Sequence, residues 1–464
     1  MATGSFFIIL SSCRNSSTDG MIIFTRAVRE QREADYVTGN SWRYIPRTSI
    51  VAMNPDKQTK SKVLSEDFYS ARSPEISYDG KFMLFTAQKK QNDPWQIWEM
   101  RLADSKVRQV TSLSENCTDP AYLPGGRLAF SRSAVNDSLK AGHSLYTCNL
   151  NGSEVKRITF NPHTYFASTV LNDGRILTID KQLYPEQGDQ VFMVLRPDGT
   201  KEDMFYKGMD GSKIYSRGWE TNQGRVVFIE SDRESHEGGN IVSISYNRPL
   251  HSWINLTSKI KGDFCTAFPL SSGRMIVSYR ESDKESFALY EFDPESGSPG
   301  KVIYNDKDYD ILEVVVAGKH ERPKKLPSEV DMGVKSGLLL CQDINVLYPG
   351  SPLNATTLPM TTAIEVLGID STLGVVKVEE DGSFYLKVMS DKPFRIRTID
   401  KNGNVLHGPC GWIWLRPNER RGCVGCHEDS ELVPENRVSL AVKKPPVVIP
   451  VHITRVKEKK VSLE

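Results

Sequence analysis

The stretch SPEISYDGKFMLFTA, residues 73–87, decides the fold of this 464-residue chain. It contains a turn that ends in Gly-Lys, and a run of residues that favour β-strands follows. Four later segments repeat the phrase, at residues 119–133, 167–180, 217–231 and 266–280. The turn glycines of the five segments are Gly80, Gly126, Gly174, Gly224 and Gly273, at intervals of 46, 48, 50 and 49 residues. So regular an interval predicts a repeated structural unit.

A second hairpin follows each phrase, as in WQIWEMRLADSKVRQVT at residues 95–111. Two hairpins make a four-stranded unit, which is the size of a propeller blade. MIIFTRA, at 21–27, begins an incomplete early unit, and YDILEVVVAG, at 309–318, is a lone late strand. If the late strand completes the early unit, six blades close the ring. We therefore predict an all-β fold with a six-bladed propeller over residues 21–317, and seven blades as the alternative.

The repeat resembles the WD40-like or TolB-like propeller repeat, in which a turn ending in Asp-Gly-Lys precedes an apolar strand and a later strand ends near a threonine. SYDGKFMLF, at 77–85, and VRQVT, at 107–111, are the closest copies in this sequence.

The repeat stops at a linker rich in Pro and Lys, residues 318–329. Alternating segments at 336–348, 362–369, 374–389 and 392–406 are joined by Asp-Gly and Asn-Gly turns, which predicts a small β-sandwich-like domain over residues 330–445. A weakly basic tail, residues 446–464, ends the chain.

The sequence RRGCVGCHEDSELVPENR, at 420–437, contains the Cys-x-x-Cys-His string of c-type haem attachment. Cys423 and Cys426 are spaced to form thioethers with one porphyrin, and His427 then follows as the axial iron ligand. One haem c is therefore the predicted cofactor. A zinc site that adds His407 and Cys410 to the two cysteines is an alternative, and a redox dithiol lacks the βαβ setting that it needs.

The ligand on the other side of the iron is left open by the sequence. Met389 is the first candidate, with Met360, His407 and His452 behind it. Basic side chains crowd the motif and suit the haem propionates or, alternatively, a solvated loop; they are Arg416, Arg420, Arg421 and Arg437. Trp412 and Trp414 alternate along a strand and face one side, where they cover either the porphyrin or the core.

The first residues, MATGSFFIILSSC, resemble a short export signal followed by a lipoprotein cleavage site, so residues 1–20 are predicted as a signal region with lipidation at Cys13. The predicted location is the periplasm or the cell surface, with contact to the membrane through the lipid anchor. A formal net charge of +1 gives no reason to expect nucleic-acid binding.

The C-terminal part resembles the hydrazine synthase alpha subunit family, in which a propeller precedes a haem c domain. The residues that carry this resemblance are VEEDGSFYLKV, the Trp412 and Trp414 pair, RPNERRGCVGCHE and PENRV. In that family a tyrosine soon after the motif is described as the ligand of the catalytic haem. Here Glu428, Asp429, Ser430 and Glu431 follow the motif, so His427 remains the expected ligand.

These observations predict an electron-transfer protein rather than an enzyme, with the propeller as a docking platform for a redox partner protein or small molecule. The first alternative is a haem-dependent oxidoreductase subunit of a multi-subunit complex that acts on a small nitrogen or oxygen compound. The second is a propeller binding protein whose haem is a sensor.

Overall fold

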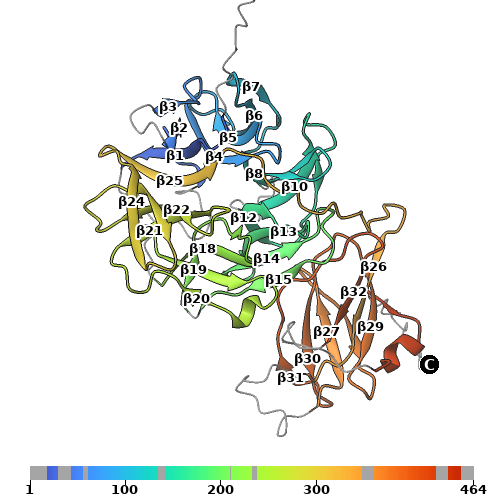
Figure 1. Ribbon diagram of the computed structural model, residues 1–464. Coiled ribbons are helices and arrows are strands. Elements are labelled where there is room, and N and C mark those ends of the chain that lie inside the picture. Colours follow the sequence, from blue (N-terminus) through green and yellow to red (C-terminus); the bar gives the residue numbers. More distant parts are fainter. Residues whose placement is uncertain are drawn as a thin grey trace, which may run out of the picture.

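Strands make up nearly all of the regular structure in a computed structural model of the chain (Figure 1). The structure describes residues 18–29, 43–55, 61–133, 142–209, 211–232, 238–346, 360–424 and 437–450. Within these residues the strands form eight sheets, which confirms the predicted all-β fold. No helix of the described part is long and apolar enough to cross a bilayer.

Six of the sheets lie around a common centre (Figure 1). The first contains β1 (Ile22–Val28), β2 (Ser49–Met53), β3 (Ser61–Val63) and β25 (Tyr309–Val316). The second contains β4 (Ser70–Ile76), β5 (Phe82–Gln88), β6 (Gln96–Arg101) and β7 (Lys106–Gln109). The third contains β8 (Cys117–Leu123), β9 (Arg127–Ser133), β10 (His143–Asn149) and β11 (Lys156–Arg157).

The other three sheets continue the ring. The fourth contains β12 (His163–Val170), β13 (Ile176–Gln182), β14 (Gln190–Leu195) and β15 (Asp203–Tyr206). The fifth contains β16 (Lys213–Ile214), β17 (Trp219–Glu220), β18 (Arg225–Ser231), β19 (Asn240–Ser245) and β20 (Ile254–Asn255), with the 3-10 helix η3 (Pro249–His251) between the last two. The sixth contains β21 (Asp263–Pro269), β22 (Met275–Arg280), β23 (Ala288–Asp293) and β24 (Ser298–Tyr304).

The late strand β25 pairs antiparallel with β1, from Ile22 opposite Val316 to Val28 opposite Tyr309. This pairing confirms the prediction that the late strand completes the early unit. It also leaves β1 with a partner on each side, β25 and β2, so that β1 is not an edge strand of the first sheet.

An apolar cluster fills each space between neighbouring sheets of the ring. For example, Phe192 of the fourth sheet and Phe228 of the fifth meet edge to face, with ring centroids 4.9 Å apart. At the seam, Phe24 and Val314 of the first sheet share a cluster with Leu289 of the sixth. Burial of apolar side chains between successive sheets is the main force that holds the ring together.

A β-bulge interrupts the innermost strand at the same place in β4, β8, β12 and β21. Ser73, Asp119 and Ala167 lie at three of these bulges with φ of 54°, 52° and 52°. Residues other than glycine seldom adopt such a backbone, and bulges commonly re-aim a side chain beside a site. The bulges line the centre of the ring.

The C-terminal domain consists of two further sheets that share one apolar cluster. The first sheet has the order β32-β26-β29-β33, from β26 (Ser336–Cys341), β29 (Phe384–Met389), β32 (Arg420–Cys423) and β33 (Val447–Val448). The second has the order β28-β27-β30-β31, from β27 (Ala363–Leu367), β28 (Thr372–Lys377), β30 (Arg395–Ile399) and β31 (Val405–His407). The 3-10 helix η4 (Leu440–Lys443) precedes β33.

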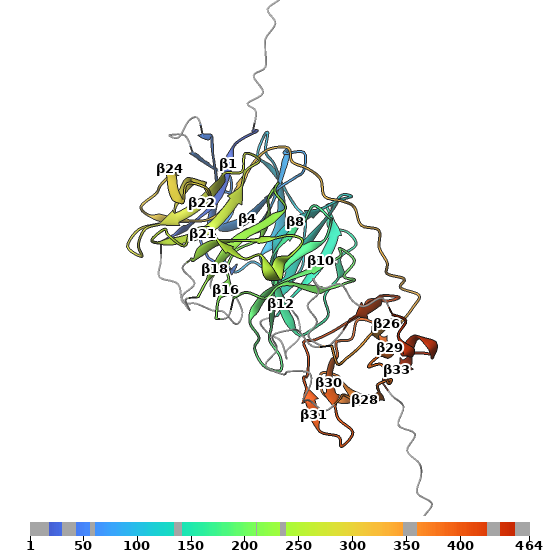
Figure 2. The same ribbon diagram turned by 60° about the horizontal axis from the view of Figure 1, so that its bottom comes forward.

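The linker between the ring and the C-terminal domain is held against the ring. Figure 2 shows it following the face of the ring down to β26. The backbone N–H groups of His320 and Lys324 donate to the carbonyls of Tyr78 (3.1 Å) and Asn172 (3.0 Å). A Cβ on Gly174 would lie 2.1 Å from the Lys324 carbonyl oxygen, and the residue has φ of 92°, so only glycine lets the linker come this close.

Candidate functional site

Cys423, the first cysteine of the haem motif, lies at the end of β32. This strand runs parallel to β26 and places Cys423 opposite Cys341. Cys423 is half-buried and packs against the apolar cluster of the C-terminal domain. β32 is an edge strand of its sheet, so its outer side is not covered by another strand. This position suits a bulky cofactor attached through sulfur, and Cys423 therefore fits a covalent haem.

The rest of the motif, Cys426 and His427, lies outside the described residues, as do Cys13 and His452. The two ends of that segment nevertheless meet at one residue. The Asp343 N–H donates to the Val424 carbonyl (3.0 Å), and the Asp343 carboxylate binds Arg437 (3.0 Å). Arg437 also donates to the Gln342 carbonyl (3.1 Å), so both ends of the motif segment are fixed at the end of β26.

Two of the predicted propionate arginines are occupied by protein partners. Arg416 donates to Asp391 (2.7 Å) and to the Asp198 carbonyl (3.0 Å) of the ring. Arg421 donates twice to one oxygen of the buried Glu419 (2.7 and 3.0 Å). Arg420 is exposed on β32, three residues before Cys423. The fourth, Arg437, is paired with Asp343, so Arg420 is the exposed arginine beside the motif that forms no ion pair among the described residues.

The structure does not bring Met389, the first candidate for the second iron ligand, to Cys423. Met389 pairs with Ser336 at one end of β26, whereas Cys423 pairs with Cys341 at the other end. Five residues of strand separate the two positions by roughly 16 Å. Met389 is also 53% exposed, on the face of β29 away from the core to which Cys423 contributes. We therefore do not retain Met389 as an iron ligand.

Met360, His407 and Cys410 are not gathered around Cys423 either. Met360 is 65% exposed, and His407 ends β31 in the second sheet of the domain. The Cys410 thiol lies 3.2 Å from the Ile396 N–H, in the same second sheet. The described residues contain no group of three or more His, Cys, Asp or Glu arranged to hold a metal ion.

Trp412 and Trp414 are both buried, but they face the ring. Trp412 donates its indole N–H to the Tyr184 carbonyl (2.7 Å), and the Trp414 ring lies 5.4 Å from that of Phe160. They are interface residues between the C-terminal domain and the third and fourth sheets. Sequence reasoning missed this role because the covering surface belongs to a distant repeat.

A buried polar network joins β32 to the same face of the ring. Glu419, which holds Arg421, also accepts the Lys201 N–H (2.8 Å). The neighbouring Glu202 accepts from the Tyr165 hydroxyl (2.7 Å), and burial together with the negative charge of Asp180 raises the pKa of Glu202 to about 7. Through Glu419, which immediately precedes β32, the network ties the strand that carries Cys423 to the ring.

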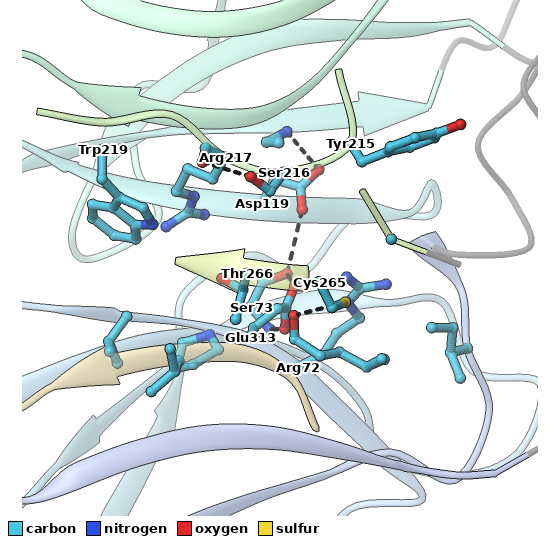
Figure 3. A pocket seen from close by; sticks show the side chains of 17 residues that line it. Arg72, Ser73, Asp119, Tyr215, Ser216, Arg217, Trp219, Cys265, Thr266 and Glu313 are labelled. Carbon is cyan, nitrogen blue, oxygen red and sulfur yellow. Dashed lines mark hydrogen bonds and ion pairs between the residues drawn. The ribbon is translucent and has the colours of Figure 1, made fainter. Parts of the chain in front are cut away.

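A second candidate site is a cavity of about 110 Å³ at the centre of the ring (Figure 3). Equivalent residues of the repeats line it: Ser73, Asp119, Ala167, Arg217, Cys265 and Glu313. The first four lie seven residues before the turn glycines, so an alignment of the repeats on those glycines would have found them.

The charges around this cavity are paired within the protein. Arg72 donates to Glu313 (2.6 Å), and Arg217 donates to Glu75 (2.6 Å). Burial would raise the pKa of Glu313, but the charge and hydrogen bonds of Arg72 outweigh it and lower that pKa to about 2. Burial raises the pKa of Glu75 to about 7 even beside Arg217. These pairs tie sheets together across the centre of the ring.

The fold and the attachment strand define a class: proteins in which a ring of four-stranded sheets precedes a small β-domain with a Cys-x-x-Cys-His motif. A family model described as "Hydrazine synthase alpha subunit middle domain" matches residues 309–428. The curated "Hydrazine synthase subunit alpha" of Kuenenia stuttgartiensis is 22% identical, with the match covering 88% of this chain. This chain spans 66% of the length of that relative.

Solved structures are also similar to this chain. "Kuenenia stuttgartiensis Hydrazine Synthase" matches with a TM-score of 0.80 and 21% identity, over 92% of this chain and 71% of the other. TolB from Acinetobacter baumannii matches with a TM-score of 0.45 and 14% identity, over 64% of this chain and 66% of the other. The predicted resemblance is confirmed: the chain is similar to the hydrazine synthase alpha subunit.

The comparisons correct the main functional prediction. Electron transfer is wrong as the first choice, because the relatives named above are a subunit and a structure of a synthase, which is an enzyme. The prediction that the protein is not an enzyme is therefore not supported either. The prediction that the comparisons support is that of an enzyme subunit.

Proposed function

We propose that this chain is the haem-carrying subunit of a multi-subunit oxidoreductase that acts on a small nitrogen compound, as its hydrazine synthase alpha-like sequence suggests. The observation that carries the proposal is the edge strand β32, which presents Cys423 half-buried and open on one side, within the residues that match the family model. Cys423 and Cys426 hold the haem in this proposal, and His427 is its iron ligand. A haem with a single protein ligand binds and activates small molecules.

The ring supports this function as a platform. We infer that its six sheets are the blades of a six-bladed propeller, closed by the β1–β25 pair. Its fourth blade contacts the C-terminal domain through Trp412 and through Lys201. The propeller thus holds the haem domain in one orientation and leaves most of its own circumference for partner subunits.

Location follows from the chemistry of attachment. Thioether bonds to haem are made outside the bacterial cytoplasm, so we propose an exported protein of the periplasm or cell surface. Lipidation of Cys13 anchors it to the membrane in this proposal. Metabolic labelling with a fatty acid tests the anchor, since Cys13→Ser abolishes the label if the cysteine is the acceptor.

The haem assignment is tested by producing the full chain in cells that attach haem c, with Cys426→Ser and the control Cys410→Ser beside it. Intact-protein mass should show one haem on the wild type and on the control, and a lost or singly linked haem on Cys426→Ser. A wild-type chain without covalent haem contradicts the proposal and favours a propeller binding protein instead.

The enzyme assignment is tested by adding carbon monoxide to the reduced protein. An immediate shift of the absorption bands indicates an open iron position, as catalysis on a small molecule requires. Bands that carbon monoxide leaves unchanged indicate two protein ligands and contradict the proposal.

A further inference from the structure

A cleft of about 630 Å³ lies between the propeller, the linker and the C-terminal domain. We refer to it as the interdomain cleft; Arg157, Arg196, Lys325 and Arg416 are among the residues that line it. Ligand sites typically occupy 300–1,000 Å³ and occur preferentially at domain interfaces. The described residues Arg420 to Val424, which include Cys423, are not among the residues that line the cleft.

The cleft carries a strong positive charge on a chain whose formal net charge is only +1. Seven of its lining side chains are basic and two are acidic. Both acidic side chains already bind partners within the protein. Asp198 accepts four hydrogen bonds, two of them from the linker residues Ser328 and Glu329, and Asp391 is paired with Arg416. The excess of positive charge is therefore not neutralised by the residues that line the cleft.

Four of the bases are paired, Arg127 and Lys156 with Glu154, Arg196 with Glu329 and Arg416 with Asp391. Among the described residues the other three, Arg157, Lys324 and Lys325, form no ion pair within 4 Å, although the charge of Asp391 acts on Arg157 at longer range. The Arg157 guanidinium donates Nε–H to the Thr159 carbonyl (2.6 Å), which leaves its other N–H groups available. The backbone of Lys324 is fixed by its bond to Asn172, and all three side chains are exposed. Cations thus approach the cleft from β11 on one side and from the linker on the other.

The floor of the cleft is apolar. The Phe160 ring lies there with two guanidinium groups over it, Arg157 at 5.1 Å and Arg416 at 4.7 Å from the ring centroid. Ile158 and Leu326 extend the apolar surface beside it. An inorganic ion would meet the cations but would leave this floor uncovered. An organic body would cover the floor and place its charges at the rim.

We propose that the interdomain cleft binds a small organic anion that carries two acidic groups on an apolar body. One acidic group pairs with Arg157, where a guanidinium can hold a carboxylate through two hydrogen bonds. The other pairs with Lys324 and Lys325. The ligand bridges the propeller and the linker, and the apolar body lies on Phe160.

Calorimetric titration of the full chain at low salt tests the proposal with defined probes. Isophthalate supplies two carboxylates on a ring, benzoate supplies one, and pyrophosphate supplies charge without an apolar body. Isophthalate should bind at least tenfold more tightly than either of the other two, and its affinity should fall as salt is added. Equal affinity for pyrophosphate contradicts the apolar part of the proposal.

Variants locate the bound probe. The double variant Lys324→Gln/Lys325→Gln should weaken isophthalate binding at least tenfold, and Arg157→Gln should do the same. The matched control is Lys259→Gln/Lys261→Gln, an exposed pair in the loop after β20, which should bind as the wild type does. An equal loss in the control, or no loss in the cleft variants, overturns the proposal.

The haem proposal and the proposal of an anion site in the interdomain cleft can be contradicted independently of each other. A Cys423→Ser/Cys426→Ser chain should bind isophthalate as the wild type does, since Cys423, the described cysteine of the pair, is not among the residues that line the cleft. Loss of binding in that variant, with the fold intact by circular dichroism, would assign the probe to the haem site and contradict a separate cleft site.

Discussion

The propeller and the C-terminal domain are both built from small antiparallel-rich sheets of four or five strands, yet only the propeller closes on itself. The propeller closes on itself, because β25 returns to pair with β1 and an apolar cluster fills every space between sheets. The C-terminal sheet that carries Cys423 does not close: its two edges are β32 and β33, short strands that run parallel to their neighbours β26 and β29. The domain also buries Trp412 and Trp414 against the propeller.

This difference indicates which part depends on the other. The propeller holds its charged centre together through pairs such as Arg72–Glu313, all within the ring. The C-terminal domain, by contrast, uses the propeller as one of its walls. We therefore expect substitutions in the ring to affect the whole molecule, and substitutions at the interface to release the C-terminal domain alone.

The largest effect is expected at the seam of the ring. Glu313→Ala removes the carboxylate that the buried Arg72 binds at 2.6 Å, and breaking a buried ion pair typically costs about 3–5 kcal/mol of the free energy of unfolding. Urea denaturation of the wild type and the variant measures the loss. The exposed Glu295→Ala, in the turn between β23 and β24, is the control and should change the midpoint little. A loss no larger than that of the control would show that the pair does not hold the seam.

The Glu313 pair should also respond to acid. Its pKa in the folded protein, about 2, lies below the ordinary glutamate value of 4.5. The stability that it contributes is therefore present above about pH 4.5 and is lost as the pH falls toward 2. The difference between the wild type and Glu313→Ala should shrink over that range.

The interface is tested by Trp414→Ala, which removes a fully buried side chain from the surface that faces Phe160. We expect a cost of about 3 kcal/mol, at the lower end for such a change because the two domains can close around the cavity. Calorimetry should show an earlier separate transition of the C-terminal domain while the propeller transition stays in place. The partly exposed Trp253→Ala is the control. If both transitions move together, the domains do not differ as proposed.

Glu202, on the propeller side of the interface, allows a test by pH. Its pKa is raised to about 7, so its contribution is complete below the unfolded value of 4.5 and is lost as the pH rises through 7. Glu202→Gln should remove this loss and be the more stable protein by on the order of 2 kcal/mol at about pH 8. Parallel denaturation profiles of the two proteins at about pH 5 and pH 8 would contradict a buried, uncharged Glu202.

The smallest effect concerns the linker. Gly174→Ala and Gly224→Ala both place a Cβ on a residue with positive φ, but only the first meets the linker, at the Lys324 carbonyl. Gly174→Ala should therefore cost about 1 kcal/mol more than Gly224→Ala, through loss of the Lys324–Asn172 hydrogen bond. Faster proteolysis of residues 318–329 in Gly174→Ala only would support this; equal rates would contradict it.

The propeller could be predicted from the sequence because its information is periodic. The turn glycines mark each unit, and the lone strand at residues 309–318 pairs with the start of the chain as predicted. The inner residues were also within reach, since Ser73, Asp119, Ala167 and Arg217 stand at one offset from those glycines. In a repeat protein, equivalent residues can be found by aligning the units on such a shared position.

The sequence of the C-terminal domain contains no repeat that could be aligned in this way. RRGC is short and polar and does not alternate, so nothing in it predicts the edge strand β32. Met389 is a candidate iron ligand only by its closeness in sequence, whereas the strand pairing places it at the far end of the sheet from Cys423. The interdomain cleft is invisible in the sequence because its bases come from β11, the linker and Arg416. Contacts between segments far apart in the chain decide this region.

The seam between β1 and β25 also sets an order on biosynthesis. The ring is closed at β1, its earliest described strand, and only once residues 309–316 have been made. Any shortened product that stops earlier keeps β1 with an unpaired edge, which favours aggregation over a soluble half-protein. The motif cysteines Cys423 and Cys426 come later in the sequence than β25. The ribosome therefore completes the strands of the propeller before it makes these two thiols.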